Sequence, residues 1–260
     1  MTPAESNAPV PTVIVQPNRD LTAAAIAARL GDLVVALTSE PHSEPSVHIC
    51  VTGGGLGGAI WPLLAADPGW QDVHVWFSDE RFLPMGDPER NDTAVLTAAD
   101  RLGLPVRGIH SVAGPDTVPD ATSAAWAYAA DLATWARLTG SAGDVPAPLF
   151  AVSLLGMGPD GHVASLFPGR PEVTVAAATV VPVTASPKPP PIRVSFTRRL
   201  IEHCQRLWLI AAGADKAPAA RRALADDTPL ATPAAGLRGR DETLWLVDQT
   251  LAAGLSRLPD

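Results

Sequence analysis

An apolar segment that ends in a glycine-rich loop is the feature that most constrains the fold of this chain. Residues 149–155 (LFAVSLL) are almost entirely apolar, which is typical of a strand buried on both faces of a parallel sheet. The segment runs into a turn with glycines at 156, 158 and 161, beside which lie Asp160 and His162. Ligands of open α/β sheets bind just beyond the carboxyl ends of the strands. A histidine there suits general-base catalysis, although an unreactive loop histidine explains the spacing equally well.

Strand-like and helix-like segments alternate along nearly the whole chain. Strands are predicted at 12–16, 47–52, 72–78, 108–112, 149–155, 174–184, 192–196, 207–212 and 243–247. Helices are predicted at 21–38, 59–66, 92–102, 121–138, 197–204, 215–226 and 248–255. This order predicts an α/β fold, Rossmann-like, with a mostly parallel central sheet and helices on both faces. We expect a single domain over residues 12–260 behind a flexible tail of residues 1–11, with Asp20 capping the first helix and Trp126, Leu132 and Trp135 in the core.

Composition excludes several classes of protein. The chain has 260 residues with 19 basic and 27 acidic side chains, a net charge of −8, and no basic run, which argues against nucleic acid as a partner. No apolar run reaches membrane-spanning length and residues 1–11 do not resemble a signal peptide, so we expect no membrane association and a cytoplasmic location. Cys50 and Cys204 make no disulfide framework, and no metal-type spacing appears. We therefore expect neither a metal nor a cofactor.

A second glycine-rich loop follows the strand predicted at 47–52. Gly53, Gly54 and Gly55 open a run that continues to Gly58 and leads into a predicted helix. Free backbone N–H groups at such a junction favour negative charge, and we predict that these glycines bind a phosphate or another anion. The alternative is a tight turn without a ligand. The loop is neither a dinucleotide fingerprint nor a P-loop, because the lysine and the required spacing are absent.

Charged residues follow two further strands. Asp79, Glu80 and Arg81 come directly after the strand at 72–78, and Arg81 could hold a phosphate through its planar guanidinium. Lys188 lies on a stiff, extended proline segment, and Arg193 lies in the strand that follows. A solvated strand end and an ordinary exposed lysine are the alternatives.

Together these motifs resemble the 6-phosphogluconolactonases. The resemblance covers nearly the whole chain after residue 12 and rests on the glycine loop 53–58, the segment 76–81 (WFSDER) with Asn91 downstream, the loop 156–169, and the segment 186–191 (SPKPPP) with Arg193. It implies an enzyme that hydrolyses 6-phosphoglucono-δ-lactone in the oxidative pentose phosphate pathway. It also implies the fold that this family shares with the glucosamine-6-phosphate deaminases.

Lactone hydrolysis needs an activated water, a group that stabilises the tetrahedral oxyanion, and residues that hold the substrate. We predict that His162 is the general base and that Asp160 orients its imidazole or binds substrate hydroxyls. The substrate is predicted to bind through the following residues: Gly53, Gly54, Gly55, Asp79, Arg81, Gly158, Lys188 and Arg193. The cations among them are expected to face the phosphate or the oxyanion. The only predicted partner is a small sugar phosphate, and a monomer is expected because no exposed apolar stripe is evident.

The chain departs from the family pattern at one place. Many lactonases carry Ser-Thr-Pro inside the first glycine loop, where this sequence has Gly55, Leu56 and Gly57, which offer no hydroxyl group to a phosphate. The deaminases carry Asn-Glu-Pro after the histidine, whereas residues 164–169 (ASLFPG) resemble the lactonases. Two alternative functions remain open: a sugar-phosphate isomerase or deaminase, and a non-catalytic sugar-phosphate-binding regulator.

Overall fold

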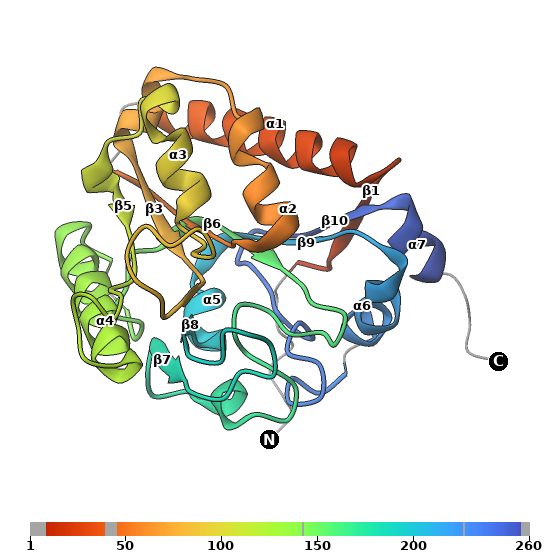
Figure 1. The fold of residues 1–260 in the computed structure, drawn as a ribbon. Helices are drawn as coiled ribbons and strands as arrows, with labels where there is room; N and C mark the ends of the chain where they lie inside the picture. Colours follow the sequence, from red (N-terminus) through yellow and green to blue (C-terminus); the bar gives the residue numbers. More distant parts are fainter. Residues whose placement is uncertain (1–8, 40–45, 142, 226, 256–260) are drawn as a thin grey trace.

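A seven-stranded parallel sheet forms the centre of the molecule (Figure 1). The computed structural model describes residues 9–39, 46–141, 143–225 and 227–255. The strand order is β1-β10-β9-β6-β2-β3-β5, and neighbouring strands pair in parallel. The strands are β1 (Thr12–Gln16), β2 (Val47–Val51), β3 (Val73–Phe77), β5 (Ile109–His110), β6 (Phe150–Gly156), β9 (Cys204–Ala211) and β10 (Glu242–Asp248). The sheet extends from β2 toward β3 on one side and from β6 toward β9 on the other, so the order in which strands are added reverses between β2 and β6.

Helices cover both faces of this sheet, as predicted, and each face has its own hydrophobic core. Helices α1 (Arg19–Thr38), α2 (Gly54–Ala59) and α3 (Thr93–Leu102) enclose the first core, which contains Trp208. Helices α4 (Ala121–Leu138), α5 (Arg198–Ile201), α6 (Ala217–Leu224) and α7 (Gln249–Leu255) enclose the second, which contains Trp245. The two tryptophans lie on adjacent strands and are each 1% exposed, so each packs into the core on one of the two faces of the central sheet.

A small antiparallel sheet was not predicted. It has the order β4-β8-β7 and is formed by β4 (Asp79–Arg81), β8 (Arg193–Phe196) and β7 (Val180–Val183). Its register places Arg81 opposite Arg193 and Asp79 opposite Ser195. Two charged segments that are more than a hundred residues apart in the sequence are thereby joined at one edge of the main sheet.

Several predicted details of the helices are wrong. Asn18, rather than Asp20, caps α1, and its side chain accepts the Leu21 N–H at 2.9 Å. Helix α2 begins inside the glycine loop, five residues before its predicted start, and it ends at Ala59, where the predicted helix 59–66 was expected to begin. Trp126 is 71% exposed rather than buried, while Trp135 packs on the His74 imidazole with ring centroids 4.0 Å apart.

Helix α1 has the length and apolar composition of a membrane-spanning helix. Its buried residues, which include Ile26, Leu30 and Val34, pack into the first core against the central sheet. The remaining helix and strand limits differ from the predicted ones by a few residues, with β7 shortened most.

The proline segment is a closed loop rather than the predicted extended one. The Ser186 N–H donates to the Pro191 carbonyl at 2.9 Å, and the Ser186 hydroxyl donates to the Lys188 carbonyl at 2.8 Å. The serine therefore folds the segment back on itself. Lys188 lies at the tip of this loop.

Candidate active site

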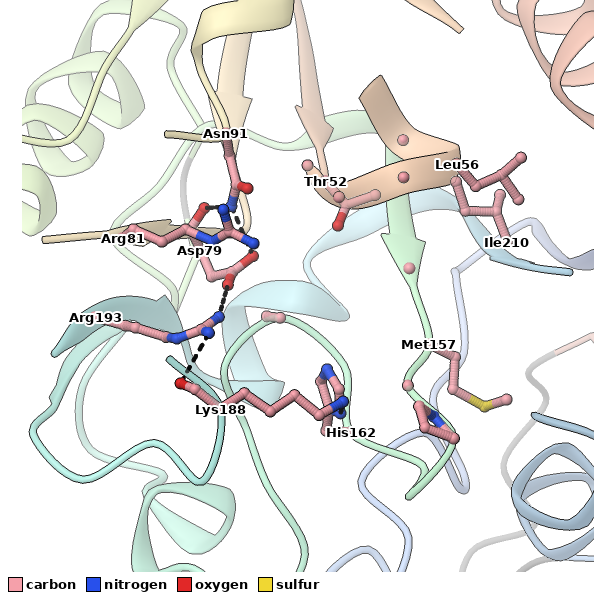
Figure 2. A pocket seen from close by; sticks show the side chains of 18 of the residues that line it. Thr52, Leu56, Asp79, Arg81, Asn91, Met157, His162, Lys188, Arg193 and Ile210 are labelled. Carbon is pink, nitrogen blue, oxygen red and sulfur yellow. Dashed lines mark hydrogen bonds and ion pairs between the residues drawn. The ribbon is translucent and has the colours of Figure 1, made fainter. Parts of the chain in front are cut away.

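A cavity lies where the strand order of the sheet reverses. It has a volume of about 310 Å³ and opens at the carboxyl ends of β2, β6 and β9, between the two glycine-rich loops (Figure 2). Open α/β sheets bind ligands at such a switch point. Nine of the ten predicted site residues line this cavity: Gly53, Gly54, Gly55, Asp79, Arg81, Gly158, His162, Lys188 and Arg193. The tenth, Asp160, lies behind His162.

Asp160 and His162 form a hydrogen-bonded pair. Asp160 Oδ1 lies 2.5 Å from His162 Nδ1, which assigns the hydrogen on Nδ1 to this contact. The other ring nitrogen, Nε2, is then left to accept a proton. The imidazole is held from the side by the Phe167 ring, with centroids 4.7 Å apart, and its side chain is only 16% exposed. The histidine is thus fixed in tautomer and orientation at the cavity wall.

Gly158 permits this arrangement by having no side chain. A Cβ at this position would lie 2.0 Å from His162 Cε1 and 2.6 Å from Asp160 Oδ1. The loop is closed by two backbone hydrogen bonds, from the Gly158 N–H to the His162 carbonyl and from the Gly161 N–H to the Gly158 carbonyl. The Gly158 backbone therefore lies directly against the Asp160 and His162 side chains.

Charges around Asp160 favour its ionised form. Burial raises its pKa, but the hydrogen bond with His162 and the charges of His162 and Lys188 outweigh burial and lower the pKa to about 2. Lys188 Nζ lies 3.9 Å from Asp160 Oδ1 and 3.4 Å from His162 Nδ1. The lysine therefore places a positive charge beside the pair, at the point where Figure 2 shows its amine reaching the imidazole.

The opposite wall of the cavity is built on β4. Asp79 accepts the Ser165 hydroxyl at 2.7 Å through Oδ2, and its backbone carbonyl accepts the Asn91 amide at 2.8 Å. The Arg81 guanidinium donates through Nη1 to the Glu89 carbonyl, and its Nε has no hydrogen-bond partner among the described residues. Arg81 is thus held by the hydrogen bond from Nη1, and the side chain lines the cavity.

Glu80 joins this wall to the loop that follows it. Its carboxylate accepts the backbone N–H groups of Arg81 and Asn91 at 2.7 Å each and that of Asp92 at 3.0 Å. The side chain is fully buried, and burial raises its pKa to about 7, although the nearby Arg90 and these hydrogen bonds oppose the increase. Glu80 therefore does not reach the cavity, but it holds Arg81 and Asn91 in place.

Arg193 binds the loop that carries Lys188. Its guanidinium donates to the carbonyls of Lys188, Pro189 and Pro190 at 3.0–3.2 Å, while Nη1 lies 3.9 Å from Asp79 Oδ2. Burial lowers the pKa of Arg193, and the neighbouring Asp79 counteracts this effect. Most of its donors are used by the protein, so the geometry favours a role in positioning Lys188 over direct phosphate binding.

Lys216 also lines the cavity, and the sequence analysis missed it. Burial, together with the charges of Arg19 and Lys188, lowers its pKa, against the opposing effect of Asp215. Lys216 follows Gly213, just beyond the carboxyl end of β9. The expectation that ligands bind beyond the carboxyl ends of the strands, which led to Asp160 and Arg81, therefore applies to Lys216 as well. Because Lys216 was assigned to the helix predicted at 215–226, it was not considered as a site residue. The other lining residues that were not predicted as substrate-binding are Thr52, Leu56, Gly57, Asn91, Gly156, Met157, Pro159, Ala164, Pro189 and Ile210.

No metal-binding group is evident in this region. Within the described parts of the chain, no three or more His, Cys, Asp or Glu side chains are arranged to hold a metal ion. The free thiols of Cys50 and Cys204 are buried in the core.

Comparison with known families agrees with this geometry. Residues 18–245 match the family described as glucosamine-6-phosphate isomerases/6-phosphogluconolactonase. The chain belongs to this family. It is 42% identical over 255 residues to the 6-phosphogluconolactonase of Streptomyces coelicolor, with 95% of each chain covered. It is 38% identical over 250 residues to the enzyme of the same name from Mycobacterium tuberculosis, covering 94% of this chain and 98% of that one.

The fold is similar to that of solved family members. The 6-phosphogluconolactonase from Trypanosoma brucei is 25% identical and superposes with a TM-score of 0.77 over 95% of this chain and 99% of that one. A monomeric glucosamine-6-phosphate deaminase, 19% identical, superposes with a TM-score of 0.68 over 93% of this chain and 99% of that one. Because both branches of the family share this fold, the site residues have to decide between their reactions.

Proposed function

We propose that this protein is an enzyme that hydrolyses 6-phospho-D-glucono-1,5-lactone to 6-phospho-D-gluconate in the oxidative pentose phosphate pathway. The observation that carries the proposal is the Asp160–His162 pair, which faces a cavity lined by several cations. The names of the two relatives described above, which match nearly the whole chain, support the same reaction.

His162 acts as the general base. Its Nε2 takes a proton from a water molecule, whose oxygen attacks C1 of the lactone. The bond between C1 and the ring oxygen then breaks, and the ring oxygen receives the proton from the imidazolium. Asp160 holds the Nδ1–H and stabilises the positive charge that develops on the ring.

The cations have two separate tasks in this mechanism. Lys188 lies beside the Asp–His pair, so it stabilises the oxyanion that forms at C1. Arg81 and Lys216, together with backbone N–H groups of residues 53–57, hold the phosphate. Arg193 contributes by fixing the Lys188 loop.

We infer a monomeric enzyme from the sequence, in which no exposed apolar stripe is evident. The predicted partner remains a small sugar phosphate, without nucleic acid or a membrane. The proposed pathway consumes and produces water-soluble sugar phosphates, so we assign the activity to the cytoplasm.

One experiment tests this function directly. The lactone is generated in situ, and its disappearance is followed with and without the protein after subtraction of spontaneous hydrolysis. We expect a large acceleration and no ammonia release from glucosamine 6-phosphate. Ammonia release without lactone hydrolysis would favour the deaminase alternative, and binding without turnover of either compound would favour the regulator.

A further inference from the structure

Arg19, the first residue of α1, lies against the first glycine loop. A Cβ atom at Gly55 would lie 2.3 Å from Arg19 Nη2 and 3.4 Å from Arg19 Cζ, and the three nearest atoms to that position all belong to the Arg19 guanidinium. Helices α1 and α2 lie side by side on the same face of the sheet (Figure 1). The guanidinium therefore fills the space that a side chain at residue 55 would occupy.

The Arg19 side chain has no protein partner among the described residues. It makes neither a hydrogen bond nor an ion pair there, although Gly55 beside it lines the active-site cavity. An arginine carries five N–H donors in a planar arrangement that matches phosphate oxygens. An unpartnered guanidinium at the cavity edge thus has the chemistry of an anion ligand.

Lys216 links Arg19 to the cations of the cavity. The charges of Arg19 and Lys188 both act on the pKa of Lys216, which lies among the cavity residues. The acidic groups that act on Lys216 are Asp215 and Asp248, and the latter is occupied by hydrogen bonds from Gly213, Thr250 and Leu251. An anion bound between these groups would offset the repulsion that Lys216 experiences from Arg19 and from Lys188.

We propose that Arg19 binds the phosphate of the substrate and that the absence of a side chain at Gly55 admits its guanidinium. The inference rests on the proposed function, since it names a ligand of the phosphomonoester group. It also accounts for the departure at residues 55–57 from the hydroxyl-bearing pattern of many lactonases. In this chain, a charged donor from α1 takes the place of a hydroxyl from the loop.

The test combines variants at both positions. Because a hydrogen bond to a charged group is lost, Arg19→Ala should raise KM for the phosphorylated lactone about 10- to 100-fold. The effect on kcat should be small, and the kinetics with unphosphorylated glucono-δ-lactone should not change. Arg29→Ala removes the same charge from α1 at a residue that lies over the Trp208 ring, so it should behave like wild type.

Gly55→Ser supplies the second arm of the test. A serine here should displace Arg19 and raise KM. In the double variant Arg19→Ala/Gly55→Ser the space is vacant and a hydroxyl is present, so KM should fall below that of either single variant. Additive losses in the double variant, or a normal KM in Arg19→Ala, would overturn the role of Arg19.

Calorimetric binding of 6-phosphogluconate and of gluconate separates this inference from the proposed function. Arg19→Ala should weaken binding of the phosphorylated compound about 10- to 100-fold and leave gluconate unaffected. Unchanged binding of 6-phosphogluconate would refute the Arg19 assignment even if wild type hydrolyses the lactone. Conversely, absence of lactone hydrolysis by wild type would refute the proposed function but not a phosphate contact that this titration detects.

Discussion

Replacement of Asp160 by asparagine tests the Asp–His pair most closely. The substitution keeps the shape of the side chain and an oxygen that can accept the His162 Nδ1–H, but it removes the negative charge. The pKa of Asp160 is lowered from 3.8 to about 2, chiefly because the interactions with His162 and Lys188 outweigh burial. Since one pKa unit corresponds to about 1.4 kcal/mol, these interactions favour the carboxylate by roughly 2.5 kcal/mol before solvent is considered.

Solvent reduces this value. The Asp160 side chain is 36% exposed, so screening leaves an interaction of about 1–1.5 kcal/mol. If the carboxylate stabilises the imidazolium by this amount in the transition state, Asp160→Asn should lower kcat about tenfold with little change in KM.

The assay is steady-state lactone hydrolysis between pH 5 and 8, corrected for spontaneous hydrolysis. Asp227→Asn is a suitable control, because Asp227 is bound to Thr232 and does not line the cavity. A kcat for Asp160→Asn equal to that of wild type would refute the electrostatic role of Asp160.

Three further predictions concern residues that support the site. Gly158→Ala should lower activity by at least tenfold while circular dichroism stays native, because its Cβ would lie 2.0 Å from the His162 ring; activity near wild type would contradict the role of the glycine. Glu80 has a pKa of about 7 in the folded protein, against an ordinary value of 4.5. Between these two pH values the folded state therefore binds more protons than the unfolded state. The buried carboxyl group thus lowers the stability of the protein as the pH rises from 4.5 to 7. The unfolding free energy of Glu80→Gln, measured by urea denaturation relative to wild type, should therefore increase by up to about 3 kcal/mol from pH 4.5 to pH 7, and a constant difference would count against the raised pKa. Arg193→Ala should release the Lys188 loop, so limited proteolysis should cut within residues 186–191 faster and kcat should fall; an unchanged cleavage pattern would show that the arginine is not needed to hold the loop.

The sequence was sufficient to predict the main sheet and most of the cavity. Apolar runs such as 149–155 are long enough to identify strands buried on both faces, and the alternation with helices predicts their parallel arrangement. Because parallel strands present their carboxyl ends at one edge, residues that follow different strands meet there. This reasoning correctly brought Asp79, Arg81 and His162 to one cavity.

The rest depends on contacts between distant segments. Strand β4 has only three residues, all charged, and it is defined by its pairing with β8, so no local pattern indicates it. The sequence also does not indicate which groups a side chain will bind in the folded protein. Arg193 resembles a phosphate ligand in the sequence, but three carbonyls of the 188–190 loop occupy its donors. Trp126 fits a helical core pattern, but it projects outward because helical spacing alone does not fix which face of α4 is buried.

The rate of lactone hydrolysis by His162→Gln tests the central claim most directly. The measurement compares kcat of the variant and of wild type on enzymatically generated lactone, after subtraction of spontaneous hydrolysis, with calorimetric binding of 6-phosphogluconate as a check that the cavity is intact. Because general-base catalysis contributes about 10²- to 10⁴-fold, we expect kcat to fall by that factor while product binding persists. Turnover within a few-fold of wild type, with binding intact, would contradict the assignment of His162 as the base.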